Sequence, residues 1–228
     1  MKNVKNKICA LIAVRSGSKR VPDKNIRNFA NSNLLELKIN SIKETSIDKI
    51  YVSSDDGRML DLAVRLGAIA IERDKYYASD HVPMSEVYVH MAQGLECDHI
   101  AYLNVTSPLL SSETLQNCVE RYKSLPKEYD SLATVTLIKE YMWMNDVPVN
   151  YDPRNHPRSQ DLPEIYGVNF AACILPRALM MRNRNIIGNS FFKFETSQEE
   201  SIDIDTMIDF EIAEFLYKRR LNPRGEDV

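Results

Sequence analysis

Short apolar runs alternate with amphipathic segments along the first 137 residues of the chain. The runs have the composition of buried strands, and each is followed by residues with helical spacing, so that one strand and one helix recur about every 30 residues. The expected strands cover residues 8–14, 49–54, 68–71, 100–105 and 130–137, and the expected helices cover 33–45, 59–66, 84–96 and 112–124. This alternation predicts an α/β fold with a mostly parallel sheet flanked by helices.

The alternation breaks down between residues 138 and 165. Large apolar residues stand side by side from Tyr141 to Met144, and four prolines follow in a polar, irregular stretch. Apolar side chains in such a segment suit either an interface between subunits or a loop packed on its own domain, and we favour the interface. We therefore expect one domain over residues 1–228 with an inserted dimerisation segment at about 138–165. The sheet then resumes at 167–175, followed by a short helix from 176, an edge strand at 191–194, a terminal helix at 207–220 and a polar tail at 221–228.

Composition excludes several classes of protein. The net charge of −3 argues against a general nucleic-acid binder, and no apolar run approaches the ~20 residues that a membrane span needs. The first apolar run stops after seven residues at Arg15 and lacks a cleavage site, so we expect a cytoplasmic protein and no signal peptide. The cysteines are dispersed and predict neither a zinc site nor a disulfide framework: Cys9, Cys97, Cys118 and Cys173.

A cluster of positive charge follows the first apolar run directly. Small residues at positions 16–18 lie among four cations, Arg15, Lys19, Arg20 and Lys24. Small residues let backbone N–H groups approach an anion, which the long cations can then surround. A solvated surface loop is the alternative, and the stretch matches neither the Walker A nor the GxGxxG motif. Because ligands of such sheets bind beyond the carboxyl ends of the strands, we predict a polyphosphate site on a Rossmann-like nucleotide-binding sheet.

Two further polar strand ends, at residues 53–55 and 104–108, are expected on the same rim. A third polar feature lies near the terminal helix, where alternation places Asp203 and Asp205 on one face and their isoleucine neighbours on the other. Two carboxylates on one face offer the hard oxygen ligands that suit Mg²⁺. The alternative for Asp205 is that it caps the helix that follows.

Five stretches, taken in order, resemble the motifs of the acylneuraminate cytidylyltransferases. This family includes CMP-sialic acid synthetases and relatives that activate legionaminic, pseudaminic and keto-deoxy-octulosonic acids. The matching stretches are residues 11–25, 52–55, 106–108, 158–163 and 201–205, and the resemblance covers about residues 7–218. It implies transfer of CMP from CTP to a sugar acid, sialic acid or a related nonulosonic acid, with release of pyrophosphate and Mg²⁺ as the cofactor.

The site residues that we expect fall into three groups. Catalysis is assigned to Lys19, Arg15, Asp203 and Asp205, of which the two aspartates would hold the metal. Nucleotide binding is assigned to Arg15, Ser16, Gly17, Ser18, Lys19, Lys24, Asn25, Arg73 and Ser85. Substrate binding is assigned to Asn104, Thr106, Ser107, Arg158, Gln160 and Asn169. The expected partners are CTP, a sugar acid and a second copy of the chain, with no nucleic acid and no membrane.

The chain departs from the family pattern in places. Ser16 replaces the first glycine of the N-terminal motif, a position where glycine is freer to adopt a positive φ. Asn104 and Asn169 stand in stretches that differ from those of sialic acid synthetases, so the acceptor is open to another nonulosonate or a less usual acid. One alternative is a related nucleotidyltransferase with another acid acceptor or nucleotide. Another is a non-catalytic nucleotide-binding or assembly protein, which the presence of both aspartates disfavours.

Overall fold

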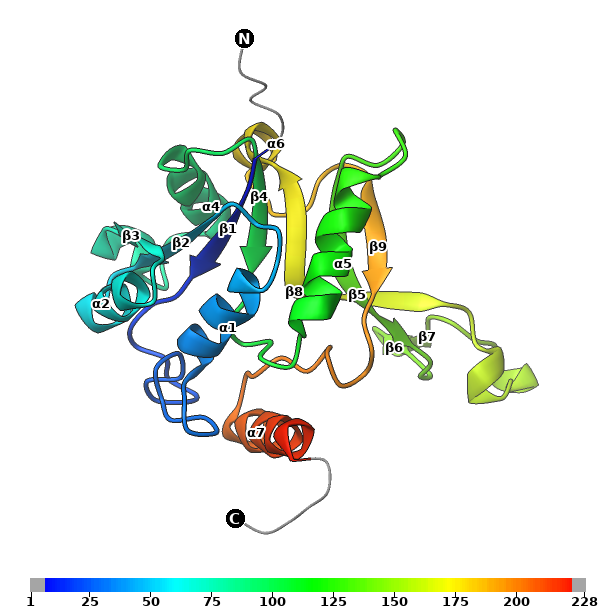
Figure 1. Cartoon of the computed structure of the whole chain (residues 1–228). Helices are drawn as coiled ribbons and strands as arrows, with labels where there is room; N and C mark the ends of the chain where they lie inside the picture. Colours follow the sequence, from blue (N-terminus) through cyan, green and yellow to red (C-terminus); the bar gives the residue numbers. More distant parts are fainter. Residues whose placement is uncertain (1–6, 223–228) are drawn as a thin grey trace.

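Seven strands form one mixed sheet in the computed structural model, which describes residues 7–222 (Figure 1). The strand order is β3-β2-β1-β4-β8-β5-β9. The strands are β1 (Ile8–Ala13), β2 (Lys49–Ser54), β3 (Ile69–Glu72), β4 (His99–Leu103), β5 (Ser131–Ile138), β8 (Ile165–Pro176) and β9 (Phe191–Glu195). All neighbouring pairs are parallel except those of β8, which runs antiparallel to both β4 and β5. The mostly parallel α/β sheet predicted from the sequence is confirmed.

Helices cover both faces of this sheet. They are α1 (Leu34–Lys43), α2 (Gly57–Arg65), α3 (Lys75–Ala78), α4 (Met84–Gln93), α5 (Ser112–Lys123), α6 (Arg177–Asn183) and α7 (Met207–Leu221). Strand β1 contributes side chains to two hydrophobic cores, one on each face of the sheet, because successive side chains of a strand point to opposite faces. Its residues Ile8, Ala10 and Ile12 pack with α1, α2, α5 and α7, whereas Cys9 and Leu11 pack with α4 and α6.

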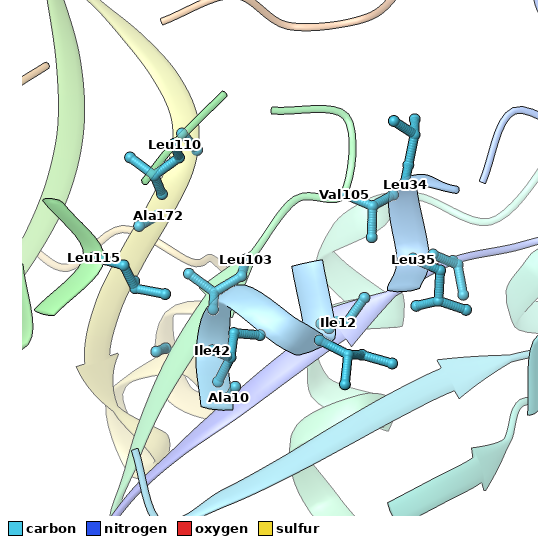
Figure 2. Close-up of a cluster of buried hydrophobic side chains, with 14 of the residues drawn as sticks. Ala10, Ile12, Leu34, Leu35, Ile42, Leu103, Val105, Leu110, Leu115 and Ala172 are labelled. Atoms are coloured by element: carbon cyan, nitrogen blue, oxygen red, sulfur yellow. The ribbon is translucent and has the colours of Figure 1, made fainter. Parts of the chain in front are cut away.

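Helix α1 is fixed against the strands that carry the rim. Its residues Leu34, Leu35 and Ile42 lie close to Ile12 and Leu103 in the buried cluster of Figure 2. All of these side chains are at most 1% exposed. The burial of each large side chain stabilises the packing of α1 by about 1.5–3 kcal/mol. The loop between β1 and α1 is therefore anchored at both ends.

The inserted segment forms a small structure of its own. A two-stranded hairpin, β6 (Trp143–Met144) and β7 (Val147–Pro148), is followed by two 3₁₀ turns, η1 (Pro153–Asn155) and η2 (Ser159–Asp161). Figure 1 shows this segment projecting beyond the sheet, at the side opposite to the loop that follows β1. Trp143 is 57% exposed and Met144 65%.

Some sequence expectations need correction. Residues 72–83, expected as a loop, contain the short helix α3. The dispersed cysteines predicted no disulfide, yet Cys9 and Cys97 are joined by one, because β1 and the residue pair before β4 meet in space. Asp203 and Asp205 lie outside any strand, although the alternation holds: Ile204 is buried and both aspartates are exposed. Most of the tail expected at 221–228 lies outside the described residues. Among the described helices, none has the length and apolar character that a membrane crossing requires.

Candidate active site

The carboxyl ends of β1, β2 and β4 meet at one rim of the sheet. Register places Ala13 beside Ser53 and Leu11 beside Tyr102, so the loops after these strands emerge together. The segments after β1 and β4 enclose a pocket of about 360 Å³. Its lining is Ala13, Val14, Arg15, Gly17, Ser18, Lys19, Arg20, Lys24, Asn25, Asn104, Val105 and Thr106. We call this the rim pocket.

Hydrogen bonds fix the shape of residues 15–24, which carry the four cations and which we call the basic loop. The Ser16 backbone N–H and hydroxyl donate to the Asp55 carboxylate at 2.9 and 2.6 Å, and the Asn25 amide donates to the Arg15 carbonyl at 3.1 Å. Partial burial opposes ionisation of Asp55, but the Ser16 hydrogen bonds outweigh it and lower the pKa of Asp55. Gly17 has a positive φ of 74° and Asp23 one of 52°, whereas Ser16 has none. A serine in place of the first glycine therefore causes no backbone strain, and its hydroxyl adds a hydrogen bond to Asp55, the residue after β2.

The segment that carries the two aspartates lies against the rim pocket. Its backbone is pinned at Ile204, whose N–H donates to the Thr106 carbonyl at 2.8 Å and whose carbonyl accepts from Lys24 Nζ at 2.6 Å. Asp205 pairs with Arg20 at 2.8 Å. Burial lowers the pKa of Lys24, and the nearby Asp203 and Asp205 oppose that shift. Residues 180 positions apart in the sequence are thus joined in one site.

Asp203 and Asp205 have the chemistry of magnesium ligands. Desolvation raises the pKa of Asp203, which a hydrogen bond from Thr106 partly offsets, and a nearby cation would reverse this penalty. No cluster of three or more histidine, cysteine, aspartate or glutamate side chains suited to a metal occurs within residues 7–222. Mg²⁺ commonly takes one or two carboxylates and completes its shell with water and substrate phosphates. The pair therefore fits an ion shared with a phosphate ligand, and Mg²⁺ stays a prediction.

A second pocket, of about 300 Å³, adjoins the first and shares Ala13, Val14 and Arg15 with it. We call it the inner pocket. Its remaining lining is Arg73, Tyr77, Ala78, Ser79, Asp80, Val82, Met84, Val87 and Tyr102. Arg73 is only 4% exposed and donates to the Val14 carbonyl, yet its Nε finds no hydrogen-bond partner among the residues described. Burial lowers the pKa of Arg73. A buried donor without a partner is destabilising.

Asp80 connects the two pockets. Its carboxylate pairs with Arg15 at 2.6 Å and with Lys19 at 2.8 Å, and Arg15 also donates to the Ala78 carbonyl at 2.8 Å. Hydrogen bonds from Lys19 and then Arg15 lower the pKa of Asp80 to about 2. Asp80 was not predicted from the sequence, and Arg20 was predicted only as one of four cations around a polyphosphate. Asp80 carries no local signal, since its partners lie more than 60 positions away.

Several predicted residues lie away from the two pockets. Ser85, in the first turn of α4, is half-buried beside the inner pocket but does not line it. Ser107 is buried, and its carbonyl accepts from Lys38 at 2.9 Å. The Asn169 amide is engaged with the hydroxyls of Thr134, Thr136 and Thr196, linking β5, β8 and the residue that follows β9.

The insert carries the other two predicted substrate-binding residues. Arg158 pairs with Asp161 at 2.8 Å, and Gln160 is exposed in η2. Figure 1 shows the insert at the side of the sheet away from the loop that follows β1. The structure therefore brings most of the predicted nucleotide residues together with Asn104 and Thr106, whereas Ser85, Arg158 and Gln160 of the same chain lie outside this group. Their roles in binding stay predictions.

Comparison with known proteins agrees with this geometry. The model of the cytidylyltransferase family matches residues 9–224. The chain is 29% identical over 220 residues to a pseudaminic acid cytidylyltransferase of Campylobacter jejuni, covering 91% of this chain and 95% of the relative. It is 29% identical over 229 residues to a CMP-N,N'-diacetyllegionaminic acid synthase of Legionella pneumophila, covering 92% and 96%.

A solved structure of a CMP:2-keto-3-deoxy-manno-octonic acid synthetase complexed with CTP has the same fold. Its TM-score is 0.68 at 15% identity, with coverage of 94% of this chain and 99% of the other. The family predicted from the five motifs is confirmed, because the family match spans nearly the whole sequence. The chain belongs to the cytidylyltransferase family of nucleotidyltransferases.

Proposed function

We propose that this protein transfers CMP from CTP to a sugar acid, sialic acid or a related nonulosonic acid, and releases pyrophosphate. The observation that carries the proposal is the rim pocket: a cationic loop faces it, and the segment with Asp203 and Asp205 is hydrogen-bonded to two of its lining residues. The named substrates of the relatives, pseudaminic and diacetyllegionaminic acid, support a nonulosonate as the acceptor.

The chemistry needs positioned cations. A hydroxyl oxygen of the sugar acid attacks the α-phosphorus of CTP, a new P–O bond forms, and the bond to the β-phosphate oxygen breaks as pyrophosphate leaves. Negative charge accumulates on phosphoryl oxygens, so catalysis requires electrostatic stabilisation and alignment. Arg15, Lys19 and Lys24 line the rim pocket and would supply that stabilisation. When bound at Asp203 and Asp205, Mg²⁺ would supply Lewis-acid polarisation of the phosphate and of the attacking hydroxyl.

The inner pocket is proposed to hold the nucleoside. Tyr77 and Tyr102 line it and offer flat apolar surface, and Arg73 adds a positive charge to its lining. Because the inner pocket joins the rim pocket at Arg15, a nucleoside placed there would direct its phosphates toward the basic loop. Ser85 lies beside this pocket at the start of α4 and is kept as a proposed contact.

A homodimer is proposed to complete the acceptor side. Four exposed apolar residues cluster on the hairpin of the insert: Trp143, Met144, Val147 and Val149. A contiguous exposed apolar patch is typical of an interaction surface. A partner subunit seated on this patch would bring Arg158 and Gln160 of one chain toward the site of the other. We further propose the cytoplasm as the compartment, since CTP is available there.

One assay tests the proposal directly. The protein is incubated with CTP, Mg²⁺ and a panel of nonulosonic acids (sialic, legionaminic, pseudaminic and keto-deoxy-octulosonic acid), and pyrophosphate release is measured. We expect release with at least one acid and none without an acid. Replacing CTP with ATP, GTP or UTP tests the nucleotide. Activity confined to another nucleotide would overturn the proposal, as would failure across the panel by a protein that binds CTP.

A further inference from the structure

Asp80 occupies the junction between the rim pocket and the inner pocket. It lines the inner pocket, whereas its partner Lys19 lines the rim pocket, and its other partner Arg15 lines both. The two ion pairs therefore cross the boundary that a nucleotide would span if its base lay in one pocket and its phosphates in the other. The Ala78 carbonyl holds Arg15 from the same side.

We propose that Asp80 is an internal anionic gate: its carboxylate pairs with Arg15 and Lys19 across the junction, and an incoming polyphosphate displaces it. The ligand named here, CTP, rests on the proposed function, but the displacement itself follows from the charges. A carboxylate and a phosphate compete for the same guanidinium and ammonium donors.

The competition favours a polyphosphate for a physical reason. Asp80 offers one negative charge, and its side chain is 47% exposed, so water and salt screen its ion pairs. A triphosphate carries several negative charges and reaches Arg15, Lys19 and Lys24 together. The gate would open for a polyphosphate and close again when pyrophosphate leaves.

The direction in which one substitution changes the affinity for polyphosphate distinguishes the gate from the main alternative. If Asp80 competes with the ligand, Asp80→Asn removes the competitor and tightens polyphosphate binding. If Asp80 instead orients the two cations for the ligand, the same change weakens binding. Because the side chain is exposed on a loop, we expect Asp80→Asn and Asp80→Ser to fold normally, which thermal melts without ligand verify.

The experiment measures dissociation constants of the full-length protein by calorimetry at low salt with three probes: inorganic tripolyphosphate, CTP and cytidine. For Asp80→Asn and Asp80→Ser we expect tripolyphosphate and CTP to bind about threefold to tenfold more tightly, with the gain shrinking as salt is added. Cytidine, which lacks phosphates, should bind as it does to the wild type. Asp80→Glu, which keeps the charge, should remain within about twofold of the wild type.

The matched control is Glu96→Gln, which removes an exposed carboxylate paired with Lys49 outside both pockets. It should leave all three constants unchanged. Weaker or unaltered tripolyphosphate binding by both charge-removing variants would overturn the gate, and so would an equal gain for cytidine. A wild-type protein that binds tripolyphosphate but not CTP would count against the proposed function alone, because the tripolyphosphate result still decides the role of Asp80.

Discussion

The rim of the sheet and the insert carry the two halves of the predicted site, and they differ in how completely one chain builds them. At the rim, long-range hydrogen bonds join the basic loop, the end of β4 and the aspartate segment, and the supporting side chains are buried. In the insert, Arg158 pairs with its near neighbour Asp161, and the Trp143 and Met144 side chains are largely exposed. This difference supports our proposal that one chain builds the nucleotide half and that a second chain completes the acceptor half.

The largest expected effect concerns the aspartate segment of the rim. Asp203→Asn removes a charged ligand of the proposed metal, so we expect kcat for pyrophosphate release to fall on the order of 10³-fold. Near-normal turnover would remove Asp203 from the chemistry.

The matched control is Asp209→Asn, a carboxylate six residues after Asp203 in the sequence. The Asp209 carboxylate accepts from the Thr206 N–H and hydroxyl at 2.6 and 2.8 Å and so completes the capping box of α7. Loss of such a cap costs about 0.5–2 kcal/mol of stability. This variant should melt at a lower temperature yet keep turnover within about fivefold of the wild type.

The second prediction concerns the basic loop. Lys19→Ala removes a cation of the rim pocket, and we expect kcat/KM for CTP to fall about tenfold to a hundredfold. Lys43→Ala, on the exposed end of α1, serves as the control and should change nothing. Unchanged kinetics with CTP in the Lys19 variant would exclude this side chain from triphosphate binding.

The third prediction turns to the insert. Replacing Trp143 and Met144 together by serine should convert dimers to monomers, as measured by light scattering after gel filtration. We expect kcat/KM for the sugar acid to fall about tenfold, with the dissociation constant of CTP unchanged. The control is Val64→Ser, which removes an apolar side chain that is 59% exposed on α2. A double variant that stays dimeric would contradict the role of the insert in dimerisation. A double variant whose affinity for CTP falls as much as its kcat/KM for the sugar acid would contradict the separation of the two halves.

The smallest effect concerns a buried support of the rim. Burial lowers the pKa of Lys38 from 10.5 to about 8, although Glu200 opposes the shift. Between these two values the unfolded chain binds more protons than the folded one, so the contribution of Lys38 to the free energy of unfolding rises with pH. Below pH 8 both states are protonated, and the cost of burying the charge is paid in full.

Urea denaturation at about pH 7.5 and pH 9.5 measures this contribution. Relative to Lys38→Met, the wild type should gain on the order of 1–2 kcal/mol between the two conditions. Lys43→Met, at the exposed end of the same helix, should show the same pH dependence as the wild type. Parallel curves for the wild type and the Lys38 variant would contradict the lowered pKa.

The fold and the arrangement of the rim could be predicted because their signals are local. Apolar runs mark strands, and the basic loop follows its strand directly, so the rim assembled as expected. The features that were missed depend on residues distant in the sequence: Asp80 meets Arg15 across 65 positions, and Cys9 meets Cys97 across 88. The partners of Asn169 could not be predicted from the sequence either, because nothing in the neighbouring residues indicates that three threonines engage its amide.

A mixing experiment tests most directly whether two chains share the acceptor half. Asp203→Asn and Arg158→Ala proteins, each impaired alone, are mixed and allowed to exchange subunits. If Arg158 acts in the site of the partner, each mixed dimer contains one intact site, and roughly a quarter of wild-type pyrophosphate release should return. No recovery, with subunit exchange verified by mass, would show that both residues act within one chain and would contradict the shared site.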